Sequence, residues 1–383
     1  MIYLDNAATT YPKPAEVISA VGNALRRLSA NPGRGGHRMA VSAAEMVFDT
    51  RRRVKELFDL DAEEQVIFTD GCTTALNTVI KGVLKPGDHV VISSYEHNAV
   101  VRPLEKMRAA GMITYSVAHP ADNDEETIES FRSQINRSTR LFICTHASNV
   151  TGRIMPIRRL CALAHSYGIL FCVDAAQSAG VLPISAKDDG YDFVCCAGHK
   201  GLYGPMGVGL LLMNHDVRLD TLTEGGTGSA SDSPLMPEEY PERMESGTLN
   251  VPGIAGLNAG VRYVQSRGCD TLYRRELKEV GYLYQRLSEN PNVILYTPMP
   301  KEGLFAPVLS FNIRDIDSES VARILDRRYG IAVRAGLHCA PSAHRILGTL
   351  DCGTVRVAPS SFTTRDNMRY LASTVYKISH SHQ

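Results

Sequence analysis

The sequence predicts an α/β protein with a mostly parallel sheet flanked by helices and a smaller α+β domain at its C-terminal end. From about residue 60, short runs rich in β-branched and aromatic residues alternate with helical patterns. That order is typical of parallel strands with helices packed on both faces of the sheet. The length of 383 residues, 44% of them hydrophobic, leaves room for a substantial core and about two domains.

The predicted strands are the short apolar runs of this alternating region. They are expected at residues 65–69, 89–93, 113–117, 140–145, 169–173, 193–196 and 209–213. Sites in such sheets lie beyond the carboxyl ends of the strands. Polar residues just after these runs are therefore the first candidates for function.

The alternation stops in the second half of the chain. A polar stretch rich in Gly, Ser and Pro, 224–241, is predicted to be an extended loop or hairpin. Residues 254–266 and 271–290 follow with helical patterns, and 309–313 and 331–334 have strand patterns.

We expect three parts along the chain. An N-terminal segment, 1–15, packs with the small domain, and a large α/β domain spans 16–255. The small α+β domain, 256–383, carries the cysteine loop described below.

Composition excludes several classes of partner. Lys and Arg balance Asp and Glu at 41 each, so no basic field favours nucleic acid or an anionic membrane. The N-terminus lacks a basic segment followed by an apolar one, and no apolar run approaches about 18 residues. Nine cysteines, an odd number, fit a reducing compartment better than a disulfide framework. We therefore predict a cytoplasmic protein.

The most informative segment is Ala-Gly-His-Lys-Gly at 197–201, which follows the apolar run 191–196. A lysine just beyond a buried strand, behind a histidine and before a run of glycines, can hold an aldehyde cofactor as a Schiff base. One strand earlier, the run 169–173 ends in Asp174. A carboxylate there can keep the pyridine nitrogen of pyridoxal phosphate protonated while Lys200 binds its aldehyde. The pair predicts a pyridoxal phosphate site.

The first strand of the alternation runs into Asp-Gly-Cys-Thr-Thr-Ala-Leu-Asn at 70–77. Free backbone N–H groups where a helix begins, together with the Thr73 hydroxyl, form a cup suited to a cofactor phosphate. The alternative is a plain helix N-cap by Thr73 or Thr74.

Two further polar residues follow predicted strands. His97 could stack on a cofactor ring and transfer a proton, although a lone histidine in a loop is more often an ordinary polar surface residue. Asn149 could donate a hydrogen bond to a phenolate oxygen, or it could simply form a turn before Gly152.

Near the C-terminus, Cys339 lies in the Gly- and Pro-flanked segment 333–341. Arg334 and His338 could favour its thiolate over the thiol, which would make it a nucleophile. A metal site of His338, Cys339, His344 and Cys352 is the alternative, but the spacings match no standard zinc pattern, and we expect no metal.

Arg356 stands in the short run Gly-Thr-Val-Arg-Val at 353–357. Its guanidinium could clamp a substrate carboxylate in bidentate fashion. The alternative is a surface ion pair, the commoner role of an arginine.

Taken in order, these motifs resemble the class V aminotransferase superfamily, and within it the group II cysteine desulfurases and selenocysteine lyases. The similarity rests on the segments 3–10, 197–200, 245–248 and 334–340, which read YLDNAATT, AGHK, ESGT and RAGLHCA. The resemblance implies a fold-type I pyridoxal-phosphate-dependent transferase that forms a homodimer.

The resemblance also implies roles for individual residues. By resemblance, Lys200 carries the aldehyde, Asp174 pairs with the pyridine nitrogen, Gln177 reaches the phenolate oxygen and His97 stacks on the ring. Cys72, Thr73, His199 and Asn149 complete the cofactor contacts of one subunit, and Thr248 joins from the other subunit. Asn149, Arg356 and Ala8 would bind the substrate, and Cys339 would accept its sulfur. Lys200, Cys339 and His97 would be the catalytic residues.

The chain departs from this family pattern at two places. Relatives commonly carry a phosphate-binding serine where Ala197 stands, so one phosphate contact is missing or replaced. The stretch 224–241 is shorter than the hairpin of the better-known group II desulfurases, and its start, 225–229, resembles a branch associated with selenium metabolism. How sulfur would be handed to an acceptor is therefore open.

The resemblance implies a cysteine desulfurase that converts L-cysteine to L-alanine and transfers the sulfur to Cys339 as a persulfide. A sulfur or selenium acceptor protein would be its partner. Three alternatives stay open. A selenocysteine lyase acting on L-selenocysteine shares almost all of this machinery, whereas a class V aminotransferase would not need the thiol of Cys339. A non-enzymatic sulfur-trafficking adaptor would not need the complete set of Lys200, Asp174 and His97.

Overall fold

The computed structural model describes residues 1–33, 35–213 and 217–380. Its central sheet has seven strands in the order β2-β8-β7-β6-β5-β3-β4. Their bounds are β2 Val66–Thr69, β3 His89–Ser93, β4 Thr114–Ala118, β5 Thr139–Thr145, β6 Leu170–Asp174, β7 Phe193–Ala197 and β8 Gly209–Met213. Only β8 of these strands runs antiparallel to its neighbours. The prediction of a mostly parallel sheet is confirmed, and each expected strand is found within about a residue of its place.

The inner strands are apolar over most of their length because helices cover both faces of the sheet. Successive side chains of a strand point to opposite faces. In β7, Val194 and Cys196 belong to one hydrophobic cluster and Phe193 and Cys195 to the other. The two cysteines therefore act as small core residues on opposite faces of the sheet.

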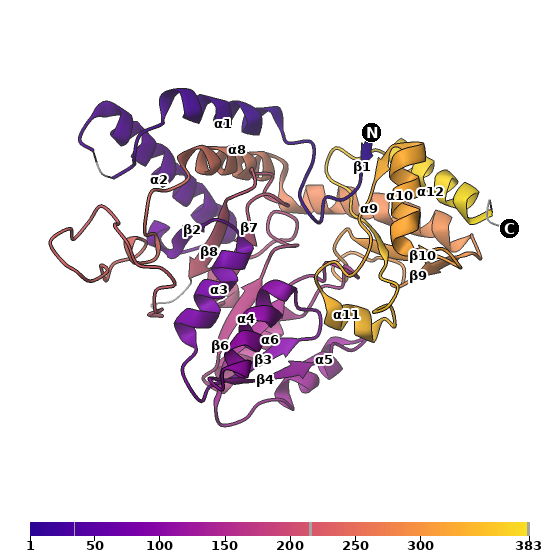
Figure 1. Cartoon of the computed structure of the whole chain (residues 1–383), viewed down its shortest axis with the longest axis horizontal. Helices are drawn as coiled ribbons and strands as arrows, with labels where there is room; N and C mark the ends of the chain where they lie inside the picture. The colour runs from indigo at the N-terminus through magenta and orange to yellow at the C-terminus, as the bar shows by residue number, and fades with distance from the viewer. Residues whose placement is uncertain (34, 214–216, 381–383) are drawn as a thin grey trace.

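Helices of the first two thirds of the chain form the two outer layers (Figure 1). One face carries α3 (Cys72–Val83) and α4 (Asn98–Ala109). The other carries α2 (Arg38–Phe58), α5 (Asp124–Arg132), α6 (Ile157–Ser166) and α8 (Val251–Arg267). Helix α1 (Ala15–Arg27) packs on α8, and the short α7 (Ala186–Asp189) precedes β7. Two 3-10 turns, η1 (Glu63–Gln65) and η2 (Glu242–Met244), complete this part.

The C-terminal part is a separate α+β layer, drawn in orange and yellow in Figure 1. Its antiparallel sheet has the order β12-β10-β9, formed by β12 Val355–Val357, β10 Leu309–Ile313 and β9 Val293–Leu295. The helices are α9 Cys269–Ser288, α10 Ser318–Tyr329, α11 Pro341–Ile346 and α12 Arg365–His380.

The strand expected at 331–334 forms only as β11 (Ile331–Ala332). It pairs in parallel with β1 (Ile2–Tyr3) and not with the C-terminal sheet, so the N-terminal segment lies against the small layer. Leu4 is fully buried in the core of that layer.

The expected domain boundary at 255/256 falls inside α8. Ile254, Leu257 and Val261 of that helix all belong to a core cluster of the large sheet. We propose that the boundary lies instead at Gly268, which has a φ of 77° and joins α8 to α9. The stretch 224–241 forms no helix or strand, as predicted for a loop. Within the described residues, no helix is long and apolar enough to cross a membrane.

Candidate active site

A cavity of about 370 Å³ opens at the carboxyl edge of the central sheet. Ten residues singled out from the sequence line it: Ala8, Cys72, Thr73, His97, Asn149, Asp174, Gln177, His199, Lys200 and Arg356. Most of them follow strands of the central sheet, whose carboxyl ends meet at one edge. Arg356 comes from β12 of the C-terminal sheet, and Ala8 comes from the N-terminal segment. The volume is in the range of small-molecule sites, about 300–1,000 Å³.

Asp174 is the last residue of β6 and is almost completely buried. Its Oδ1 accepts hydrogen bonds from the backbone N–H of Ala176 at 2.9 Å and from the thiol of Cys72 at 3.5 Å. Its Oδ2 accepts no hydrogen bond from any described residue. One carboxylate oxygen is therefore fixed by the protein, and the other can pair with a cationic group in the cavity.

Lys200 follows β7 in a glycine-rich turn. Gly201 is required there, because a Cβ at this position would lie 2.4 Å from the carbonyl oxygen of Ala179. Burial lowers the pKa of Lys200, and the nearby carboxylate of Asp174 opposes that shift. A lysine with a lowered pKa has a larger neutral fraction and is a better nucleophile toward an aldehyde.

His97 is the N-cap of α4, and its Nδ1 accepts a hydrogen bond from the backbone N–H of Ala99 at 3.0 Å. That bond places the proton of the neutral imidazole on Nε2. Burial lowers the pKa of His97, with Asp174 opposing the shift. His97 is therefore not an ordinary surface histidine, because it lines the cavity.

At the other side of the cavity lies the start of α3, whose first residues Cys72, Thr73 and Thr74 all line the cavity. Gly71 is the N-cap, and no side-chain hydrogen bond caps the helix, so the alternative of a threonine N-cap is wrong. The backbone N–H groups of this first helical turn can therefore bind an anion.

His199 also lines the cavity, and its buried Nδ1 has no hydrogen-bond partner among the described residues. Burial, with Lys200 and Lys13 nearby, lowers its pKa to about 4. Lys13 itself donates to the carbonyl oxygen of His199 at 2.7 Å, and burial lowers its pKa to about 8. Nothing in the sequence around Lys13 signalled this contact.

Gln177 and Asn149 line the cavity but have protein partners. Gln177 Nε2 donates to the carbonyl oxygen of Ala7 at 3.0 Å. Asn149 Nδ2 donates to the carbonyl oxygen of His338 at 2.7 Å, and the residue is buried. Both amides still present their oxygen atoms for other contacts.

Arg356 is only 1% exposed, so the alternative of a surface ion pair is wrong. Its Nη2 pairs with Asp5 Oδ1 at 2.9 Å, and its Nη1 donates to the carbonyl oxygen of Asn149 at 3.0 Å. Its buried Nε has no partner among the described residues. The sequence did not reveal the role of Asp5. Asp5 lies inside the motif 3–10, but its partner Arg356 is 351 residues away in the chain.

Cys339 is partly exposed and is not among the residues that line the cavity. Arg334 connects the two places, since it lines the cavity and its Nη2 lies 3.6 Å from Cys339 Sγ. The expectation that His338 would assist as a cation is wrong. His338 is buried, its Nε2 is hydrogen-bonded to Thr354, and burial together with Arg356 lowers its pKa to about 2. In the described part of the chain, no cluster of three or more His, Cys, Asp or Glu could hold a metal ion.

Glu96 is a buried carboxyl that the sequence did not single out. Its Oε1 accepts hydrogen bonds from Ser93 Oγ at 2.5 Å and from the backbone N–H of Thr145 at 2.8 Å. Burial, and then the charge of Asp174, raise its pKa to about 8. Glu96 is therefore neutral at pH 7 and adds no second negative charge beside Asp174.

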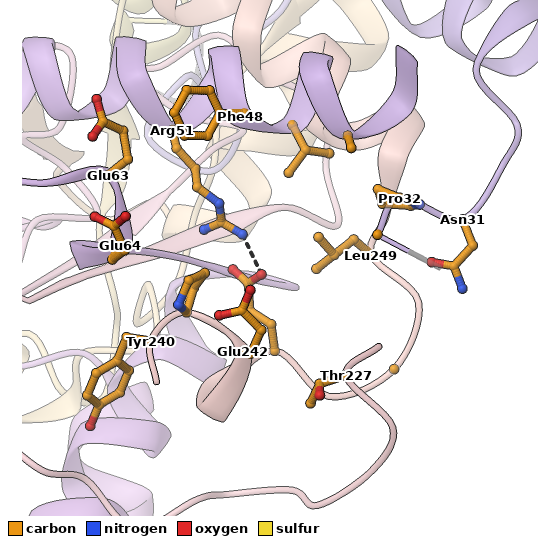
Figure 2. A pocket seen from close by; sticks show the side chains of 16 residues that line it. Asn31, Pro32, Phe48, Arg51, Glu63, Glu64, Thr227, Tyr240, Glu242 and Leu249 are labelled. Carbon is orange, nitrogen blue, oxygen red and sulfur yellow. Dashed lines mark hydrogen bonds and ion pairs between the residues drawn. The ribbon is translucent and has the colours of Figure 1, made fainter. Parts of the chain in front are cut away.

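Thr248 lies outside this cavity and is exposed; Asn31 Nδ2 donates to its hydroxyl at 3.3 Å. The segment before it is anchored by Glu245, which pairs with the buried Arg51 and accepts a hydrogen bond from the backbone of Phe68. Arg51 and Glu245 line a second cavity of about 460 Å³, between α2 and the 227–249 region. Figure 2 shows Arg51 at the wall of this cavity.

Three comparisons place these observations among known proteins. The family model described as "Aminotransferase class-V" matches residues 2–371. A protein of Methanothermobacter thermautotrophicus named "Probable cysteine desulfurase" is 31% identical over 98% of this chain and 94% of its own length. A "Cysteine desulfurase" of Pectobacterium atrosepticum is 30% identical over 99% of this chain and 93% of its own.

Among solved structures, the apo structure of a cysteine desulfurase from Thermococcus onnurineus superposes with a TM-score of 0.91. It is 30% identical, and the match covers 99% of this chain and 95% of that one. The cysteine desulfurase CsdA of Escherichia coli, 24% identical with a TM-score of 0.87, shares the fold over 98% of this chain and 94% of that one. The chain belongs to the class-V aminotransferase family.

Proposed function

We propose that the protein is a pyridoxal-phosphate-dependent cysteine desulfurase that converts L-cysteine to L-alanine. The observation that carries the proposal is that Lys200 and Asp174 line the same cavity. Arg334 also lines it and contacts the thiol of Cys339. The relatives named cysteine desulfurase support it.

The residues of the cavity fit pyridoxal phosphate. Asp174 Oδ2 has no protein donor and suits a protonated ring nitrogen, and Lys200 suits the aldehyde. The free N–H groups at the start of α3 and the unpartnered Nδ1 of His199 suit the phosphate. Ala197 lines the same cavity and offers no hydroxyl, so these groups would replace the serine of the relatives.

When bound, pyridoxal phosphate supplies an electron sink for charge that develops at the substrate Cα. Lys200 would hold the cofactor aldehyde before the substrate amine binds, and its freed amine would then move the Cα proton. Arg356 and Asn149 would orient the substrate carboxylate, and His97, which keeps its proton on Nε2, would offer that proton as a donor in the cavity.

Cys339 completes the reaction. Its thiolate attacks the substrate sulfur, so that a new S–S bond forms while the Cβ–S bond breaks. The electron pair of the broken bond stays on the carbon side, where protonation gives alanine. The sulfur remains on Cys339 as a persulfide until a thiol or an acceptor protein removes it. Arg334 Nη2 lies 3.6 Å from Cys339 Sγ and can hold that sulfur near the cavity.

We further propose a cytoplasmic homodimer in which Thr248 contributes to the partner's phosphate site. Thr248 is exposed, and the Arg51–Glu245 ion pair fixes the segment before it. Beside it, α2 presents the exposed apolar residues Met39, Val41 and Phe48 (57% exposed), which suit burial against a second copy. Phe48 lies at the cavity of Figure 2.

The test compares product release from L-cysteine and from L-selenocysteine. The wild-type protein should release alanine and sulfide from L-cysteine in the presence of a reducing thiol. Cys339→Ala should keep the cofactor absorbance and lose sulfide release. Cys352→Ala is the matched control, since that thiol is exposed and does not line the cavity.

The alternatives give different results. Transamination without sulfide would indicate an aminotransferase, and turnover of selenocysteine alone would indicate a selenocysteine lyase. Cofactor binding without any turnover would indicate an adaptor. Full sulfide release by Cys339→Ala would refute the persulfide step.

A further inference from the structure

We infer that the Cys339 loop, residues 334–340, is held against the large domain by two hydrogen bonds, and that a bound carboxylate weakens one of them. The donors are the backbone N–H of Asn98 and the side-chain amide of Asn149. The bond from Asn98 fixes the position of Cys339. The bond from Asn149 links that position to the presence of a substrate carboxylate in the cavity.

The loop backbone is strained at its centre. His338 and Cys339 have φ values of 48° and 58°, a left-handed conformation that residues with a Cβ rarely adopt. Two such residues in succession persist only where the surroundings determine them. We therefore expect His338 and Cys339 themselves to make the contacts that hold them in this conformation.

Both strained residues have their carbonyl oxygens bound by the large domain. Asn98 N–H donates to the carbonyl oxygen of Cys339 at 2.7 Å, and Asn149 Nδ2 donates to that of His338 at 2.7 Å. Asn98 is the first residue of α4, where a backbone N–H has no partner within the helix.

Asn149 serves the loop and the cavity at once. It lines the cavity together with Arg356, which donates to its backbone carbonyl. Its Nδ2 is the donor that a substrate carboxylate needs under the proposed function, on which this step rests. Nδ2 carries two N–H groups, so a carboxylate can bind the second one; by drawing the amide toward the cavity it weakens the bond to His338, and the Cys339 loop becomes freer to move.

The first test removes the Asn98 N–H without removing a residue from the binding site. Asn98→Pro fits locally, since proline is favoured at the first helical position and His97 before it is extended, with φ −71° and ψ 155°. Asn98→Ala is the matched control, because it keeps the N–H. The readout is hydrogen exchange at Gly336 and Ala340, whose amides bond within the small layer.

Loss of one hydrogen bond shifts such an equilibrium by about two- to tenfold. We expect exchange at Gly336 and Ala340 to be faster by that factor in Asn98→Pro than in Asn98→Ala, with unchanged exchange in β6. Equal exchange in the two variants would overturn the inference. If Asn98→Pro does not fold, Asn149→Ala provides the same comparison against the wild type.

The second test adds L-alanine to the holoenzyme and follows the cofactor spectrum and loop exchange together. We expect a spectral change with faster exchange at Ala340, and no further acceleration in Asn149→Ala. A spectral change with unchanged or slower exchange would overturn the coupling and leave the proposed function intact. Absence of any spectral change would count against the proposed function. The comparison of Asn98→Pro with Asn98→Ala would still decide whether the Asn98–Cys339 hydrogen bond holds the loop.

Discussion

Replacement of Asp5 by asparagine separates the stability of the Arg356 site from its function. Arg356 is fully buried, and its Nη2 pairs with Asp5 Oδ1 at 2.9 Å. Burial lowers the pKa of the guanidinium, and Asp5 opposes that shift. Asparagine keeps an oxygen acceptor of the same size and removes the negative charge.

The expected loss of stability follows from the removal of one charge of a buried ion pair. Removing one partner of such a pair costs about 3–5 kcal/mol, and Asp5→Asn should cost less because asparagine still accepts a hydrogen bond from the guanidinium. Asp5→Asn should therefore lower the free energy of unfolding by about 1–2 kcal/mol. The melting temperature should fall by roughly 1–3 °C, since the entropy of unfolding of a chain of this length is about 0.8 kcal/mol/K. Asp366→Asn is the matched control, because Asp366 pairs with Arg369 on the surface and such a pair contributes about 0–1 kcal/mol.

The effect on ligand binding should have the opposite sign. Asp5 competes with a substrate carboxylate for Arg356, so its neutralisation should tighten the binding of L-alanine by up to about tenfold. The assays are thermal unfolding and titration of the holoenzyme with L-alanine. If the variant is less stable and also binds L-alanine more weakly, Asp5 orients Arg356 for the ligand and does not compete with it. An unchanged melting temperature would refute the charge argument itself.

Three further predictions concern single groups. Lys200→Ala should abolish borohydride trapping of the cofactor, and trapping on another lysine would show that the assignment is wrong. Glu276, buried beside Tyr203, has a pKa raised to about 8 by burial, whereas the unfolded chain releases this proton near 4.5. The free energy of unfolding should thus fall as pH rises from about 4.5 to 8, and urea titrations should show a smaller fall for Glu276→Gln. An identical pH dependence would contradict that pKa. Ala197→Ser should slow cofactor loss on dialysis by up to about tenfold, and an unchanged rate would mean that another donor already fills the place.

The sheet and most of the cavity could be predicted because their signals are local. Apolar runs define the strands, and parallel strands bring their carboxyl ends to one edge. Asp174 and Lys200 lie directly after such runs, so their proximity followed from the strand assignment. Ala8 and Gln177, which came from resemblance, line the same cavity.

The remaining features depend on contacts between distant residues. Asp5 meets Arg356 and Arg51 meets Glu245 only after folding, and neither pair has a sequence spacing that could reveal it. The boundary expected at 255/256 falls inside α8, which continues to Arg267 on the core of the large sheet. The burial of His338 likewise depends on contacts that the sequence spacing does not reveal.

Burial also determines which groups near the cavity carry charge. His97 and His199 have lowered pKa values and Glu96 has a raised one, so all three are neutral at pH 7. Neutral imidazoles can bind phosphate and stack on a ring without repelling the cation of Lys200. Because Glu96 is neutral, it adds no second negative charge beside Asp174. Lys200 combines a lowered pKa with a place in the cavity, and among these groups it is the one suited to gain and lose a proton during turnover.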